Sequence, residues 1–70
     1  MSTIRWVYAS GSQWVVFDTE SQQHLEVLWS RESASWITSR SFGNQDVYVD
    51  TSEMLLMYGG YTYPIARTYY

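Results

Sequence analysis

The sequence predicts an α+β fold in which a strongly curved antiparallel sheet of about six strands packs a single helix in its concave side. Three observations lead to this prediction. Turn signals rich in Gly stand at 10–12 and 59–60, each between segments of strand character. Only the segment at about 20–31 carries apolar residues at helical spacing. The predicted order of elements is therefore ββαββββ.

The N-terminal part of the chain predicts a hairpin. Residues 5–9 alternate in the manner of a strand, so Trp6 and Tyr8 should share one face. The turn signal at 10–12 follows, and the apolar run that begins at Trp14 predicts the second strand. Because Trp6 and Trp14 both occupy apolar positions, we expect both side chains to pack in the core.

A helix is predicted from about Glu20 to Arg31. Thr19 with Gln22 three residues later fits a capping box at its start. The apolar stripe of this helix consists of Leu25, Leu28 and Trp29. Glu26 lies within that stripe, so its carboxylate needs a donor such as a backbone or an indole N–H. We therefore expect a structural role for Glu26.

The remainder of the chain predicts strands joined by turns. The expected strands lie at 36–38, 47–49, 55–58 and 61–65. The two-residue turn at Gly59-Gly60 should place Leu56 opposite Tyr63, and Tyr58 should lie on the same face as both. Pro64 donates no backbone hydrogen bond, which indicates a sheet edge or a bulge at that point.

The small size of the chain limits what can stabilise it. Its 70 residues predict one domain over 1–70, with a core at about 4–67. Such a core rarely supplies more than ~3–5 kcal/mol, and the chain has no Cys for a disulfide or a thiolate metal site. Aromatic residues, 19% of the chain, must provide the buried area. The lack of Cys fits an intracellular, cytoplasmic or nuclear protein, and we expect neither a signal peptide nor a membrane span.

The charge balance and the scarcity of reactive side chains exclude several function classes. Four Arg, no Lys and seven acidic residues give a net charge of −3, whereas binding to duplex nucleic acid needs a basic surface. His24 is the only His, and there is no Cys nucleophile. Asp46, Asp50 and Glu53 lack the spacing of a calcium-binding loop. We therefore expect a monomeric, non-enzymatic domain without metal, cofactor, DNA or membrane contact.

The pattern of two Trp and one Glu resembles the WWE domain. Trp6 lies in "RWVYASG", Trp14 in "QWVVFD" and Glu26 in "SQQHLEVLW". Asp50 and Met54 in "VYVDTSEM" and the closing segment "YPIAR" also match the family pattern, so the likeness covers about residues 4–67. The resemblance implies a half-open antiparallel β-barrel with one helix, in which Trp6, Trp14 and Glu26 hold the fold.

The resemblance also implies a ligand. WWE domains occur in proteins of ubiquitin transfer and of ADP-ribosylation, and several bind the iso-ADP-ribose unit of poly(ADP-ribose) at the open end of the barrel. By this likeness Tyr8 would stack on the adenine, Tyr58 and Tyr63 would lie at the same mouth, and Arg67 would contact the diphosphate.

Three positions depart from the family's ligand contacts. Val47, Leu56 and Tyr63 stand where binders of the family have Tyr, Gln and Arg. Tyr48 could replace the missing Tyr only if its strand shifted by one residue, which would turn its side chain to the other face. Binding of ADP-ribose should therefore be weak. The alternative is a protein-interaction module that docks a peptide or a neighbouring domain through its aromatic surface.

Overall fold

The computed structural model describes residues 3–69, so the extreme ends of the predicted 1–70 domain lie outside the described residues. The helix is α1 (Thr19–Ser30), and the strands are β1 (Ile4–Ser10), β2 (Gln13–Val16), β3 (Ala34–Ser39), β4 (Gln45–Asp50), β5 (Leu55–Tyr58) and β6 (Tyr61–Tyr69). A short 3-10 helix, η1 (Arg40–Phe42), joins β3 to β4. The predicted α+β class and the order ββαββββ are confirmed.

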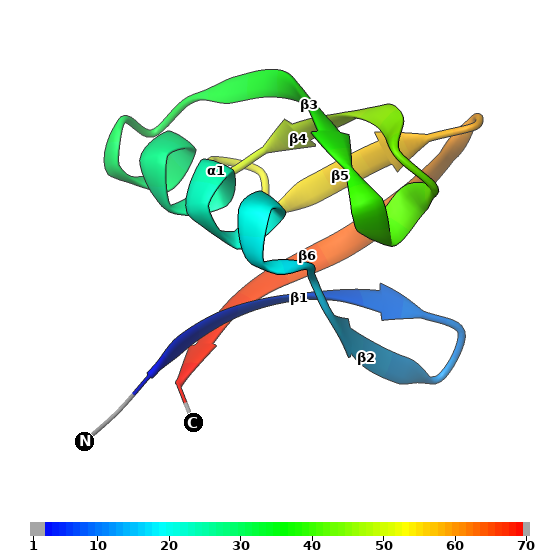
Figure 1. Cartoon of the computed structure of the whole chain (residues 1–70), viewed down its shortest axis with the longest axis horizontal. Coiled ribbons are helices and arrows are strands. Elements are labelled where there is room, and N and C mark those ends of the chain that lie inside the picture. The colour runs from blue at the N-terminus through cyan, green and yellow to red at the C-terminus, as the bar shows by residue number, and fades with distance from the viewer. Residues whose placement is uncertain (1–2, 70) are drawn as a thin grey trace.

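All six strands belong to one antiparallel sheet in the order β2-β1-β6-β5-β4-β3. The long strand β6 joins the two halves of this sheet, as Figure 1 shows. Its first residues pair with β5 as far as Pro64, and its remainder pairs with β1 from Ile65 onward. Pro64 therefore lies where β6 changes partner, which is a position that tolerates a residue without a backbone N–H.

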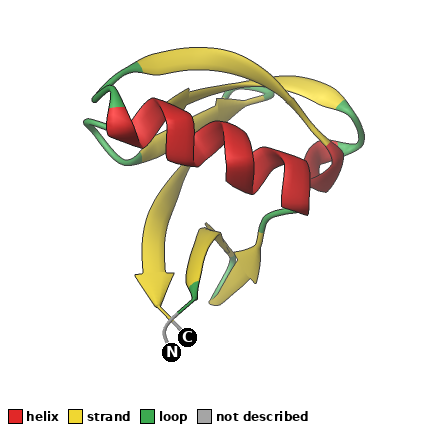
Figure 2. Cartoon of the chain, turned by 60° about the vertical axis from the view of Figure 1, so that its left-hand side comes forward, coloured by secondary structure: helices red, strands yellow, loops and turns green. Residues whose placement is uncertain are grey.

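The sheet curls around the helix but is not closed into a barrel. Its two edge strands, β2 and β3, do not pair with each other. In the sequence α1 connects these two strands, and in space it packs against β1 and β3 (Figure 2). The helix thus lies between the two halves of the sheet, which is the concave side that the sequence predicts.

The core lies between α1 and the concave face of the sheet. Trp6 and Leu25 are completely buried, and Phe17 turns inward directly after β2, where its N–H donates to the Trp6 carbonyl at 3.1 Å. The remaining members of this core are Ile37, Val47, Val49, Leu56 and Ile65. They occupy alternate positions within their strands, because successive strand side chains point to opposite faces.

The turns predicted at 10–12 and 59–60 are confirmed, and each has Gly where the backbone needs a positive φ. Gly59 and Gly60 have φ of 58° and 80°, the sign that a type I′ hairpin requires at both central positions. Leu56 pairs with Tyr63 across this hairpin, as predicted. Gly11 has a φ of 61° in the turn between β1 and β2.

The start of the helix differs from the prediction by one residue. Asp18, not Thr19, caps α1, and its carboxylate accepts a hydrogen bond from the Ser21 N–H at 3.1 Å. Gln22 does not complete a capping box. Its Oε1 accepts from the Trp6 N–H at 2.8 Å, and its Nε2 donates to the Phe17 carbonyl at 3.1 Å. Gln22 therefore fastens the helix to the first hairpin.

The expectation that Trp14 packs in the core is wrong. Trp14 is 57% exposed, because it pairs with Ala9 and so shares the outer face of β1 and β2. Val15 takes the concave position opposite Tyr8 instead. The apolar run 14–17 has no polar residue to mark the face, so its sequence does not specify which side chains point inward. Trp29, also expected in the core, is only partly covered, at 41% exposed.

Candidate functional site

A cluster of charged and aromatic side chains joins α1 to the second half of β6. The Trp6 indole N–H donates to Glu26 Oε2 at 2.6 Å. The Arg67 guanidinium donates to the same carboxylate twice, from Nε at 2.7 Å and from Nη2 at 2.9 Å. Arg67 also lies 5.5 Å from the ring centre of Trp29, which packs edge-on against Trp6. The paired fork-to-carboxylate geometry fixes the position of both charges.

The chemistry of this cluster is structural. The hydrogen bonds from Arg67 and Trp6 hold the pKa of the Glu26 carboxyl below its ordinary value despite partial burial, and Glu26 raises the pKa of Arg67. The indole donor that the sequence predicts for Glu26 is confirmed. Arg67 is the cation expected at a diphosphate. Two of its three guanidinium nitrogens donate to Glu26, and the third, Nη1, donates to the Tyr69 hydroxyl at 3.3 Å.

The three tyrosines expected at the ligand site gather at one end of the concave face. Tyr8 and Tyr63 lie edge to face with ring centres 6.4 Å apart. Phe42 of η1 packs on all three, with ring centres 4.8 Å from Tyr8, 5.2 Å from Tyr58 and 5.6 Å from Tyr63. Phe17 closes the group at 4.9 Å from Tyr8. The tyrosines are thus brought together, but a Phe side chain occupies the space between them.

Phe42 is the member of this aromatic end that the sequence does not predict. It lies in a 3-10 turn just before Gly43 and Asn44, whose positive φ values of 66° and 61° end that turn. An apolar residue next to a turn signal is the pattern that could have indicated it. Burial, followed by the nearby Tyr63, raises the pKa of the Tyr8 phenol, so Tyr8 stays protonated and uncharged.

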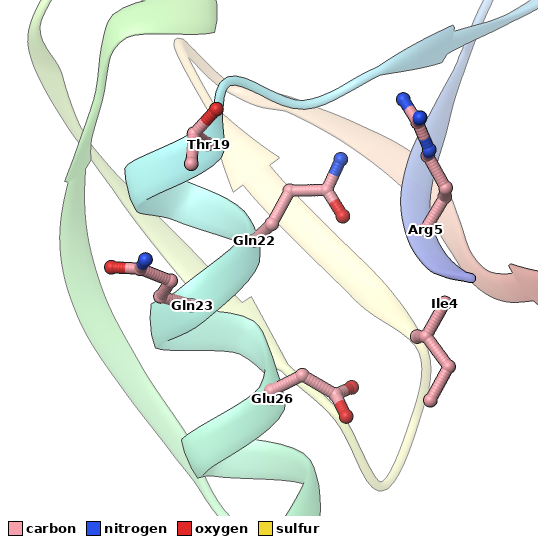
Figure 3. Close-up of a pocket in the computed structure, with 6 residues that line it drawn as sticks. All are labelled: Ile4, Arg5, Thr19, Gln22, Gln23 and Glu26. Atoms are coloured by element: carbon pink, nitrogen blue, oxygen red, sulfur yellow. The ribbon is translucent and has the colours of Figure 1, made fainter.

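A pocket of about 530 Å³ opens between α1 and the start of β1 (Figure 3). Its lining consists of Ile4, Arg5, Thr19, Gln22, Gln23 and Glu26. Gln22 and Glu26, which extend from the helix towards β1 in this view, already bond to Trp6, Phe17 and Arg67. The groups best placed to orient a ligand are therefore engaged within the protein.

The outer face of the sheet carries a row of large side chains, the central one half-buried and the outer two exposed, that we call the outer ladder: Trp36, Tyr48 and Met57. The strand register places Trp36 beside Tyr48 and Tyr48 beside Met57, on three adjacent strands. The Trp36 and Tyr48 rings meet at 67° with centres 5.4 Å apart. Trp36 is 65% exposed and Met57 48% exposed. Tyr48 thus faces away from the tyrosines of the concave end and does not replace the Tyr of the family pattern.

The outer ladder borders a groove of about 420 Å³. The groove is lined by the ladder itself together with Asp46, Tyr58, Gly59 and Gly60. Asp46 lies two residues before Tyr48 on the same strand, so the two side chains share the outer face. Its Oδ1 accepts a hydrogen bond from the Thr38 hydroxyl at 2.8 Å. The groove therefore combines ring surface with one positioned carboxylate.

Within residues 3–69, no three His, Asp or Glu side chains lie close enough together to hold a metal ion. His24 is exposed on α1. No helix in this described part of the chain has the length and hydropathy to cross a membrane. Comparison with protein-family models, curated proteins and solved structures finds no match for the chain.

Proposed function

We propose that the chain is a non-enzymatic, WWE-type interaction module that binds a protein partner on the outer face of its sheet. The observation that carries this proposal is the outer ladder, in which the exposed Trp36 and Met57 flank the half-buried Tyr48 in one row across three strands. Aromatic and Met side chains are enriched at protein interfaces, because they combine large apolar area with adaptable or polar ends. A cross-strand pair of such side chains stabilises a sheet by only about 0.2–1 kcal/mol, and their exposed apolar area gains nothing from contact with water.

The WWE-type assignment draws its support from the Trp6–Glu26–Arg67 cluster. The Glu of the signature accepts the indole N–H of the first Trp, as a fold-holding role requires. The curled sheet around one helix is also compatible with a half-open barrel whose open end is the aromatic end of the concave face. The exposed second Trp, Trp14, is the departure from this pattern.

Recognition of an iso-ADP-ribose unit is the second candidate, supported by the convergence of Tyr8, Tyr58 and Tyr63 at one end of the concave face. Binding of this nucleotide would require two existing contacts to break. Phe42 must move for a base to stack on Tyr8, and Arg67 must leave Glu26 to reach a diphosphate. Breaking a hydrogen bond to a charged group costs about 1.5–3 kcal/mol. The contacts therefore favour a protein partner over the nucleotide.

A peptide selection and a nucleotide titration separate the two candidates. Peptides selected from a random library against the folded domain should lose binding to the Trp36→Ala variant and keep it to Trp14→Ala, the matched exposed Trp on the other half of the sheet. Their binding should shift amide resonances of β3 and β4 in an NMR titration. If no peptide is enriched while millimolar iso-ADP-ribose moves resonances around Tyr8, the nucleotide function replaces the protein partner.

A further inference from the structure

The charge at the groove of the outer ladder is negative. Among residues 3–69, Asp46 is the only charged residue in its lining. On the same face of β4, Asp46 and Asp50 flank Tyr48 as alternate residues. The chain as a whole carries a net charge of −3. An anionic ligand would meet only negative charge here, whereas a cation would find an unopposed carboxylate.

The carboxylate of Asp46 is held in place and retains a free acceptor. Thr38 is the cross-strand neighbour of Asp46, and this pair lies next to the Trp36–Tyr48 pair along the two strands. The Thr38 hydroxyl occupies Oδ1 of Asp46 at 2.8 Å. Oδ2 accepts no hydrogen bond from side chains in the described part of the chain. Asp50, by contrast, uses Oδ1 to accept the N–H groups of Ser52 and Glu53 in the following turn.

The two rings provide the second half of a cation site. Because Trp36 and Tyr48 meet at 67° and do not stack, they form the walls of a corner. With Trp36 65% exposed, indole surface stays open towards the groove. Ring faces carry negative electrostatic potential and attract ammonium and guanidinium groups, Trp most strongly. A carboxylate beside such rings adds a charge partner for the same group.

We infer that this corner binds a cationic side chain, a guanidinium or an ammonium group, from a peptide segment of the partner protein. The cation packs on Trp36 and Tyr48 and pairs with Oδ2 of Asp46, while Met57 covers its aliphatic stem. The inference rests on the proposed function, since it names the chemistry of the segment that docks on the outer ladder. It requires a basic residue in the docking segment and makes the association sensitive to salt.

The test uses short glycine peptides with one central residue that is Arg, Lys, trimethyllysine or Gln. Each is titrated into the isotope-labelled domain while the Trp36 indole N–H resonance is followed by NMR. We expect at least one cationic peptide to shift this resonance and the Gln peptide to leave it unchanged. The order among the three cations identifies the group that is preferred. Trp36→Ala, in which binding is followed by the amide resonances of β3 and β4, should weaken binding by about two- to thirtyfold.

Two matched pairs of variants control for folding and for net charge. Asp46→Asn keeps an acceptor for Thr38 and removes only the charge, so it should weaken binding by up to about fivefold at low salt. Glu20→Gln makes the same change of net charge on α1, outside the groove, and should have no effect. Trp14→Ala should bind as the parent does, and a thermal melt of each variant verifies its fold.

The outcomes distinguish the inference from the function on which it rests. If library-selected peptides still require Trp36 but no cationic peptide binds better than the Gln peptide, the cation site is refuted and the protein-binding function stands. Binding of cationic peptides that is equal in Trp36→Ala also refutes the site, because it then reflects net charge alone. If selected and cationic peptides both ignore Trp36, the proposed function is refuted as well.

Discussion

Trp6 and Trp14 lie on neighbouring strands of one hairpin, and their surroundings are opposite. Trp6 on the concave face is completely buried, and its indole N–H bonds to Glu26. Trp14 on the outer face is 57% exposed, and its indole N–H donates no hydrogen bond within the described part of the chain. The single helix covers the concave face, whereas on the outer face the small Val7 is buried and the large Trp14 is not. The face on which an aromatic side chain falls therefore decides whether it stabilises the fold or remains available for contact.

The same difference separates the aromatic cluster on the concave face from the aromatic pair on the outer face. On the concave face Phe42 fills the space between Tyr8, Tyr58 and Tyr63, so these rings pack against Phe42. On the outer face Trp36 packs edge-on against Tyr48 and remains 65% exposed. Concave aromatics should thus respond to substitution through stability, and outer aromatics through binding.

The largest effect is expected for Trp6→Ala. Truncating a buried Trp costs about 3–5 kcal/mol, which equals the whole net stability of a domain this small, and it also leaves Glu26 without its indole donor. The variant should be unfolded or molten in near-UV circular dichroism and in urea denaturation. Trp14→Ala is the control and should melt cooperatively. A cooperative melt of Trp6→Ala close to the parent would contradict the assignment of faces.

A smaller loss is expected for Arg67→Ala. The variant removes a two-bond pair to Glu26 and the packing of the guanidinium on Trp29. Because the Glu26 side chain is 39% exposed, solvent screens part of this interaction. We expect a decrease in unfolding free energy of about 1–2 kcal/mol in urea denaturation. Arg31→Ala removes an exposed Arg and should change stability little, so an equal loss in both variants would count against the pair.

The sequence predicts the fold correctly but misplaces Trp14. Fold class, element order and the Gly59-Gly60 register could be predicted, because periodicity and turn chemistry are local properties. The sequence also places Trp14 in the core and so predicts an unfolded Trp14→Ala. That error arises in an apolar run in which nothing local marks the inward face.

The candidate site was harder to predict than the fold. The shared face of Tyr58 and Tyr63 follows from the hairpin register and is confirmed, whereas the family resemblance, not the strand faces, implied a place for Tyr8 beside them. The contacts that occupy this end come from Phe42 in a short 3-10 turn, and the pairing of Arg67 with Glu26 joins residues 41 positions apart. Such long-range contacts depend on tertiary packing, which a single sequence does not encode in any local pattern.

A pH-dependent effect should appear at the start of the helix. Burial alone would raise the pKa of Asp18, but hydrogen bonds from Ser21 and Ser41 outweigh it and lower this pKa to about 2 from the ordinary 3.8. A lowered folded-state pKa means that the stabilisation is complete above the ordinary value and is lost as the pH falls towards the folded one. Urea midpoints of the parent should therefore drop between about pH 4 and pH 2.

Asp18→Asn is the matched control for this titration, since Asn also caps helices but carries no charge. The parent should be more stable than the variant at neutral pH, and this advantage should shrink on acidification. Glu26, whose pKa is also lowered, titrates in both proteins and cancels in the difference. A difference that stays constant from neutral pH to pH 2 would rule out Asp18 as the titrating cap.

The smallest effect on stability is expected for Trp36→Ala. Trp36 lies on an edge strand, and its main ring contact is the cross-strand pair with Tyr48. Such a pair contributes about 0.2–1 kcal/mol, so the urea midpoint should stay close to that of the parent. The same variant is expected to lose binding of selected peptides. A loss of several kcal/mol on unfolding would show that Trp36 supports the fold, and it would remove the division between a concave face that stabilises and an outer face that binds.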